Sequence, residues 1–216
     1  MTNFVDIYQD LPSRVSEVLE RLRNPGQQKS ERDLSVTAML MAAATGLAMP
    51  WEHLKKGSNN SGEHPSFNGV DQAHYKSVRT HCEEFLKQKI SAVDCLKNNI
   101  SFMHCQKMSH ISDAIEYGNK NETIFNLEEH TLDCFVYILR NALAHNNIVA
   151  FGESKEKITK LGFFSESKGK PNCECKKIGK YLVVGITTRA LQDFLDTWFE
   201  MLTLTDQSSD NQGTST

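Results

Sequence analysis

The sequence lacks an excess of positive charge. Its 24 Lys and Arg residues are outnumbered by 27 Asp and Glu residues, and the formal net charge at pH 7 is −3. Proteins that coat long nucleic acid duplexes carry dense basic charge, because they displace counterions from many phosphates. We therefore expect any contact of this chain with nucleic acid to be small and local.

The motifs of several common enzyme classes are also absent. The chain has no P-loop, no G-x-G-x-x-G and no G-x-S-x-G. This argues against nucleotide hydrolysis, dinucleotide-dependent redox chemistry and serine hydrolase activity. We expect no cofactor.

Cysteine is present, but without a disulfide or zinc pattern. The six cysteines have irregular spacing, which is typical of reduced thiols in an intracellular protein. Cys173 and Cys175 have no second pair nearby, whereas a structural zinc ion needs four ligands, so we expect no metal site. The N-terminal residues lack the basic and then apolar layout of a secretory signal. These features predict a cytoplasmic protein.

One long uncharged run, from Leu34 to Trp51, needs an interpretation. A membrane-spanning helix needs about 20 predominantly apolar residues. This run is shorter, contains Thr37, Thr45 and Gly46, and is only mildly hydrophobic. We interpret it as a buried helix of a globular protein, with a membrane span as the alternative. We expect no membrane partner.

Apolar residues recur with helical spacing over most of the chain. The pattern predicts helices over residues 6–23, 34–50, from about 72, over 91–117 with a break at 98–99, over 123–148, and from Thr187 or Thr188 to about 203. The polar segment 57–69 is expected to be a mobile loop and the tail 204–216 to be disordered. The length fits a single domain over residues 1–203.

The periodicity changes after Gly152. Ile158–Phe164 and Tyr181–Ile186 are short β-branched and aromatic runs, which predict a β-hairpin over residues 157–186. The long loop of this hairpin contains five lysines: Lys168, Lys170, Lys176, Lys177 and Lys180. We interpret them as a solvated hairpin tip, and the alternative is an arm that contacts phosphates. The expected fold is mainly α, an up-and-down helical bundle with a small β-hairpin before the C-terminal helix.

The predicted central helix is apolar on every side from Cys134 to Leu139. A helix of this kind must be covered all round. In a chain of this size, the core on one side and a second subunit on the other would provide that cover. The pattern therefore predicts a homodimer.

Three chemically versatile residues, Arg140, Asn141 and His145, follow this apolar stretch. On a helix, Asn141 and His145 share a face, and the long side chain of Arg140 can bend toward it. A cation, an amide and an imidazole suit a reaction that moves protons while negative charge builds on a phosphate. The alternative is a helix end whose polar side chains bond local carbonyl groups.

One copy of these residues provides only one group that titrates near neutral pH. RNA cleavage without a metal ion usually needs a base, an acid and a cation for the phosphorane. Two copies that face each other across a dimer would supply two imidazoles and two guanidinium groups. The set is therefore interpreted as half of a site.

The spacing R-N-x-x-x-H near the end of an apolar helix resembles the HEPN superfamily (higher eukaryotes and prokaryotes nucleotide-binding domains). Its motif is Arg, four to six residues and then His, with a polar residue directly after the Arg, and Arg140, Asn141 and His145 fit each position. The uncharged run that leads into Pro50-Trp51-Glu52-His53-Leu54, and the hairpin with the last helix, are similar to a plasmid-associated HEPN family from bacteria.

The resemblance implies a homodimeric, metal-independent endoribonuclease, often part of a toxin or defence system with an antitoxin or regulatory protein. In this sequence, His145 would be the general base or acid, Arg140 would stabilise the transferred phosphate, and Asn141 would orient the pair. Attack by the 2′-hydroxyl of RNA would leave a 2′,3′-cyclic phosphate. HEPN toxins that are paired with a nucleotidyltransferase often carry Tyr two residues after the His, whereas this chain has Asn147.

Two further hypotheses remain open at this point. The first is a catalytically inactive HEPN-like dimer that binds RNA or a protein partner. The second is a purely structural helical domain. RNA cleavage in the presence of a chelator distinguishes the enzyme from both.

Overall fold

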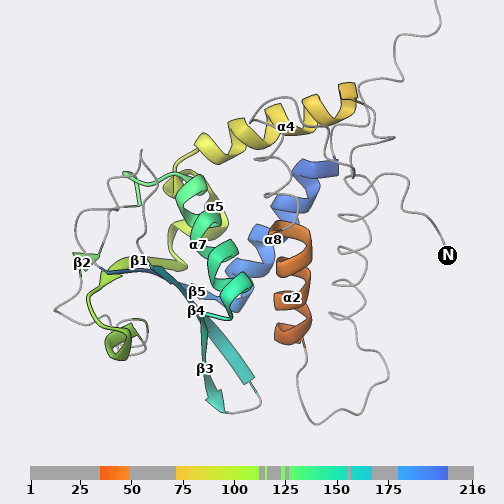
Figure 1. The fold of residues 1–216 in the computed structure, drawn as a ribbon. Coiled ribbons are helices and arrows are strands. Elements are labelled where there is room, and N and C mark those ends of the chain that lie inside the picture. The colour runs from red at the N-terminus through yellow and green to blue at the C-terminus, as the bar shows by residue number, and fades with distance from the viewer. Residues whose placement is uncertain are drawn as a thin grey trace, which may run out of the picture.

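The computed structural model describes residues 35–48, 72–111, 115, 123–124, 127–154, 157–166 and 180–203 (Figure 1). The longer helices are α2 (Ser35–Ala43), α4 (Gln72–Lys87), α7 (Leu132–His145) and α8 (Thr188–Thr203), with the short α5 (Asp94–Lys97). The strands are β1 (Ile100–Cys105), β2 (Thr123–Ile124), β3 (Ile148–Ser154), β4 (Lys157–Glu166) and β5 (Tyr181–Thr187). The predicted helix over 6–23, the loop 57–69, Cys173, Cys175 and the tail 204–216 lie outside the described residues.

The strands form one five-stranded sheet in the order β2-β1-β5-β4-β3, and every neighbouring pair is antiparallel. β5 lies at the centre and is buried over nearly its whole length. Its sequence, YLVVGIT, is rich in β-branched residues, which pack well on a pleated and buried surface. In the register of the sheet, Val184 lies between Phe102 of β1 and Phe163 of β4.

The prediction of a mainly α bundle was wrong, because the described residues form a mixed α/β arrangement built on this sheet. Residues 100–105, which were expected to be helical, form β1. Four of its six residues are buried in succession, so the sequence shows no alternation of period two. A buried strand of this kind cannot be distinguished from a buried helix by periodicity. The two strands expected near 158–164 and 181–186 lie inside the larger sheet and do not form an isolated hairpin.

Helices α7 and α8 cover one face of the sheet, and α4 and α2 pack against them (Figure 1). The core between these layers is rich in aromatic rings. The ring of Phe194 on α8 packs edge-on against Phe135 of α7, with centroids 4.9 Å apart, and lies 6.4 Å from Phe85 of α4. These three helices therefore meet at one aromatic cluster above the sheet.

The last helix begins as predicted. Thr187 Oγ1 accepts a hydrogen bond of 3.2 Å from the N–H of Ala190, and Thr188 is the first helical residue. A threonine hydroxyl at this position satisfies an N–H group that has no partner inside the helix. The predicted helix from about residue 72 is also confirmed, as α4.

The uncharged run after Leu34 forms α2 and a π-helical turn, Ala44–Ala48. Met39, Ala43 and Leu47 are buried, which confirms a helix packed inside the protein. The indole N–H of Trp198 on α8 donates a buried hydrogen bond of 3.0 Å to the carbonyl oxygen of Gly46. None of the described helices is long and apolar enough to cross a membrane.

Helix α7 is shorter than expected, since residues 123–124 belong to β2 and the helix begins at Leu132. The stretch Cys134–Leu139, its apolar belt, is covered largely by its own chain. Phe135, Val136 and Ile138 are fully buried, and Leu139 is 1% exposed. β4, β5, α4 and the π-helical turn make these contacts. Cover for the belt therefore does not require a second subunit.

The other face of the sheet carries a smaller apolar cluster, which includes Ile115, Phe164 and Val183. Ile115 packs on two glycines, Gly162 of β4 and Gly185 of β5, which lie directly opposite each other in the sheet. A Cβ atom on Gly162 would lie 2.1 Å from Cδ1 of Ile115. The glycine pair therefore makes the space that this side chain fills.

We expect Gly162→Ala to destabilise the fold, because the added methyl group would overlap Ile115 and would also lie 2.6 Å from Cγ2 of Val149. Overpacking of this kind costs about 1–3 kcal/mol. Urea unfolding followed by circular dichroism measures the change. In a double variant with Ile115→Ala, the two losses should be less than additive. A Gly162→Ala protein within about 0.5 kcal/mol of the wild type, the usual range for surface substitutions, would contradict this packing.

Candidate functional site

The candidate site lies where α7 ends. Asn146 adopts a left-handed conformation (φ 54°, ψ 34°), and the N–H of Asn147 donates a 2.8 Å hydrogen bond to the carbonyl oxygen of Ala142. This six-to-one bond with a left-handed residue is the Schellman arrangement that ends many helices, and asparagine tolerates it better than most residues. The chain then turns directly into β3 at Ile148. His145 is therefore the last helical residue, and it is exposed.

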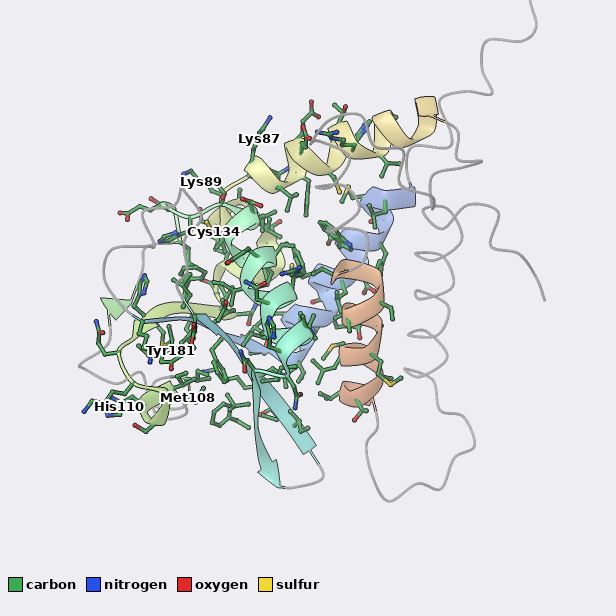
Figure 2. The ribbon with its side chains drawn as sticks, in the orientation of Figure 1. Lys87, Lys89, Met108, His110, Cys134 and Tyr181 are labelled. Atoms are coloured by element: carbon green, nitrogen blue, oxygen red, sulfur yellow. The ribbon has the colours of Figure 1, made fainter. Side chains whose placement is uncertain are left out.

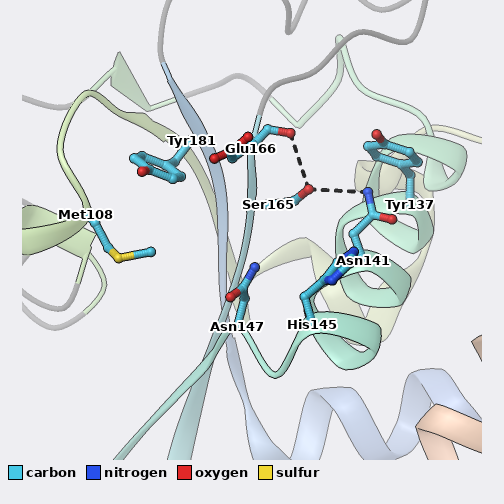
Figure 3. A pocket seen from close by; sticks show the side chains of 8 residues that line it. All are labelled: Met108, Tyr137, Asn141, His145, Asn147, Ser165, Glu166 and Tyr181. Carbon is cyan, nitrogen blue, oxygen red and sulfur yellow. Dashed lines mark hydrogen bonds between the residues drawn. The ribbon is translucent and has the colours of Figure 1, made fainter.

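A cleft of about 530 Å³ opens beside this helix end (Figure 3). One wall is a single face of α7, on which Tyr137, Asn141 and His145 follow one another at intervals of four residues. The remaining lining residues come from the ends of β4 and β5, from the turn after α7 and from the 3₁₀ turn Met108–His110: Met108, Asn147, Ser165, Glu166 and Tyr181. The volume is in the range of about 300–1,000 Å³ that is typical of small-ligand pockets.

The elements around the cleft come from distant parts of the sequence. Met108 and His110 lie on the same side of the molecule as Tyr181 (Figure 2). In the sheet, Tyr181 lies directly opposite Glu166, so the start of β5 and the end of β4 present these two residues together. The cleft therefore forms only after the sheet has assembled.

Asn141 joins the helix to the sheet through its side-chain amide. Its Nδ2 donates a hydrogen bond of 3.2 Å to Oγ of Ser165, whose hydroxyl donates in turn to the carbonyl oxygen of Glu166 at 3.3 Å. Its Oδ1 accepts a hydrogen bond from Nη1 of Arg140. Asn141 and Ser165 are only 8% and 5% exposed. Buried groups of this kind are costly to leave without hydrogen bonds, so the amide orients both the guanidinium group and the end of β4.

The structure places the three predicted site residues at the end of one helix, where Arg140 and Asn141 are hydrogen-bonded to each other. Asn141 and His145 line the cleft, as their shared helix face predicts. Arg140 is half-buried and is not among the lining residues, but its guanidinium group reaches the Asn141 oxygen. Its side chain does bend toward the cleft face of the helix.

Several lining residues were not predicted from the sequence. Tyr137 could have been found, because it precedes Asn141 by the same four-residue step that separates Asn141 from His145. Ser165 gives a weaker signal, as a polar residue that follows an apolar run. Glu166 and Tyr181 give no signal in the sequence, because their proximity depends on the register between β4 and β5.

The cleft, together with the Arg140 guanidinium group that is hydrogen-bonded to Asn141 in its wall, offers groups that can bind a phosphate and transfer protons. An imidazole can accept or donate a proton near neutral pH, a guanidinium group stabilises a phosphate anion, and two phenols and a carboxylate complete the wall. No group of three or more His, Cys, Asp or Glu side chains that could hold a metal ion occurs among the described residues.

The cysteine thiols with shifted pKa values lie away from the cleft. Burial, with a smaller contribution from Glu83, raises the pKa of Cys82 to about 12. Burial, followed by the nearby Asp193 carboxylate, also raises the pKa of Cys95. Both thiols therefore stay protonated at neutral pH, which makes them poor nucleophiles.

We expect the Asn141–Ser165 hydrogen bond to contribute measurably to stability. Asn141→Ala and Ser165→Ala should each destabilise the protein, and the double variant should lose less than the sum, with a coupling of about 0.5–1.5 kcal/mol. Chemical denaturation of the wild type, the two single variants and the double variant measures it. Strictly additive losses would contradict a direct interaction.

Comparison with known proteins identifies the family to which the chain belongs. The chain matches the family described as HEPN pEK499 p136 over residues 1–209, nearly its whole length. No curated protein and no solved structure gives a significant match. Because the match spans the described elements and the cleft residues together, the chain belongs to the HEPN pEK499 p136 family.

Proposed function

We propose that this protein is a metal-independent endoribonuclease whose complete active site forms between two copies of the chain. The observation that carries the proposal is the position of His145. It is exposed on the wall of a cleft, five residues after Arg140, whose guanidinium group is hydrogen-bonded to the buried Asn141 amide. Membership of a HEPN family supports a nucleotide-binding or nuclease domain.

The reaction uses the nucleophile that RNA carries itself. The 2′-hydroxyl oxygen attacks the adjacent phosphorus, the bond from phosphorus to the 5′-oxygen breaks, and a 2′,3′-cyclic phosphate remains. His145 of one copy takes the proton of the 2′-hydroxyl, and His145 of the other protonates the leaving 5′-oxygen. Arg140 stabilises the negative charge that builds on the phosphorane oxygens.

The requirement for two copies follows from the number of imidazoles in each cleft. One chain brings one histidine to the cleft wall, whereas the reaction needs a base and an acid. We place the contact between copies at the exposed end of α7, around Ala144, His145 and Asn146. The apolar belt of the same helix is occupied by contacts within the chain.

A nuclease of this kind would act as a toxin or a defence protein, under the control of an antitoxin or another regulatory protein. Asn147 stands where HEPN toxins that are paired with a nucleotidyltransferase often have a modifiable tyrosine. Its side chain has no hydroxyl group to modify, so we expect a partner that binds the protein rather than one that modifies this position.

Cleavage of RNA in the presence of EDTA tests the chemistry. We expect the wild type to cleave and to leave 2′,3′-cyclic phosphate ends, detected by mass spectrometry. His145→Ala should lose about 10²–10⁴-fold in rate and Arg140→Ala about 10²–10³-fold. Matched controls are His81→Ala on α4 and Arg189→Ala on α8, both exposed and outside the cleft.

Activity that survives both site substitutions would exclude the proposed site. A protein that binds RNA but cleaves none, whatever sequence is offered, would instead be the inactive binding dimer. RNA with a 2′-deoxy residue at the cleavage position should resist the wild type completely, because it lacks the nucleophile.

Mixing of chains tests the shared site separately. When a large excess of the His145→Ala chain is equilibrated with the wild type, most wild-type chains should enter mixed dimers that have a single imidazole. The cleavage rate per wild-type chain should then fall in proportion to the share of mixed dimers. A rate that does not depend on the added variant would indicate a site complete within one chain, as would a monomer in sedimentation at all concentrations.

A further inference from the structure

Two polar side chains of the cleft wall, those of His145 and Asn147, have groups to offer to a ligand. The Asn141 amide and the Ser165 hydroxyl in the same wall are hydrogen-bonded to each other. The imidazole of His145 and the side-chain amide of Asn147, in contrast, make no hydrogen bond to another described residue. Polar groups in a partly buried site are normally paired, so these two are suited to a ligand that enters the cleft.

The position of Asn147 is fixed by its backbone. Its N–H donates a hydrogen bond of 2.8 Å to the carbonyl oxygen of Ala142 on α7, and its own carbonyl oxygen accepts one of 3.2 Å from the N–H of Phe164 on β4. The first bond ends the helix, and the second continues the pairing of the sheet. The residue is half-buried and lines the cleft. Its amide is therefore presented from a rigid support, as a donor that acts in catalysis has to be.

The same turn holds the amide close to the imidazole. His145 and Asn147 flank the left-handed Asn146, and two residues span at most about 7 Å between Cα atoms. Figure 3 shows both side chains on the cleft side of the turn that joins α7 to β3. A ligand group that binds at the imidazole therefore lies within reach of the amide.

A phosphate is the ligand group that fits this pair. The Asn147 Nδ2 carries two N–H donors, and an imidazole donates when it is protonated. Phosphate oxygens are ionised acceptors, and hydrogen bonds to such acceptors are about twice as strong as those between neutral groups. The pair therefore offers donors to an anion from both ends of one turn.

The carboxylate of the described cleft lining does not oppose a phosphate at this turn. Glu166 follows Ser165 on β4, and successive side chains of a strand leave it on opposite faces. The Ser165 side chain is on the α7 side, because it is bonded to Asn141. The Glu166 side chain is on the other side, and this residue is already engaged within the protein. The turn therefore provides the better place for an anion.

We propose that Asn147 is a further catalytic residue, whose side-chain amide donates a hydrogen bond to a non-bridging oxygen of the scissile phosphate. Arg140 does not line the cleft and is bonded to Asn141, so Asn147 supplies a donor inside it. The 2′-oxygen forms its bond to phosphorus, the bond to the 5′-oxygen breaks, and the imidazoles move the protons. Asn147 keeps both of its protons, and its hydrogen bond strengthens as charge grows on the phosphorane. The proposal rests on the proposed function, because it assumes that RNA enters this cleft.

Single-turnover cleavage of an RNA that the wild type cuts tests the contribution to rate. Asn147→Ala keeps both backbone hydrogen bonds, so we expect it to fold. Its rate should fall about 10²–10³-fold, with little change in KM, because the lost bond acts mainly in the transition state. The matched control is Asn98→Ala, an exposed position at the end of α5. It precedes the end of β1 that pairs with Ile186, whereas the cleft lies at the other end, beside Tyr181.

Phosphorothioate RNA separates a direct contact from a structural role. Sulfur is a weak acceptor, so replacing the contacted oxygen at the cleavage position should slow the wild type by about 10-fold for one of the two diastereomers. Asn147→Ala should lose this difference between the diastereomers, whereas Asn98→Ala should keep it. A slow Asn147→Ala protein that still discriminates as the wild type does would overturn the proposal, as would one that cleaves at the wild-type rate.

Binding of inorganic phosphate tests the contact without any cleavage. In NMR spectra of the full chain, the side-chain NH₂ signal of Asn147, assigned by its loss in Asn147→Ala, should move together with the His145 ring signals as phosphate is added. Movement of the His145 signals alone would overturn the proposal. A protein that binds phosphate through Asn147 but cleaves no RNA would keep the phosphate contact and lose the ribonuclease. Cleavage that needs His145 but is unaffected by Asn147→Ala would do the reverse.

Discussion

The hydrogen bond between Asn141 and Ser165 is the constraint on which the geometry of the cleft depends. It joins the side chains of α7 and of the end of β4, and both partners are buried. Apolar packing holds the helix on the sheet but is non-directional, so it does not fix the rotation of the helix at its last turn. A directed bond there does, and the same amide orients Arg140. One residue therefore couples the fold to the position of the cation.

The burial of α7 bears on where the proposed contact between two copies could lie. A helix that is apolar on all sides suggests a subunit interface when it is considered in sequence alone. In the structure, β4, β5, α4 and the π-helical turn cover its belt, and only the C-terminal end is open. A contact between copies at this end would be small and polar. Ligand binding in the cleft would therefore affect this contact, because the proposed contact and the cleft share His145.

The sequence was sufficient for features that lie within one element and insufficient for those that join several. The amphipathic patterns of α4 and α8 were visible, as was the shared face of Asn141 and His145. β1 was mistaken for helix because burial on both faces removes the alternation that identifies a strand. The part of the cleft that carries Glu166 and Tyr181 could not be predicted, since it depends on long-range register. The sequence shows that these side chains are present, but it does not show that they lie close together.

β4 ends and β5 begins at the rim of the cleft, where Glu166 and Tyr181 lie directly opposite each other. The pairing of these two strands therefore holds one wall of the cleft in place, while the end of α7 holds the other. A slip of one residue in this pairing would turn every side chain of the slipped strand to the opposite face of the sheet. Substitutions that weaken the register along β4 or β5 would therefore reshape the cleft even where they lie far from it.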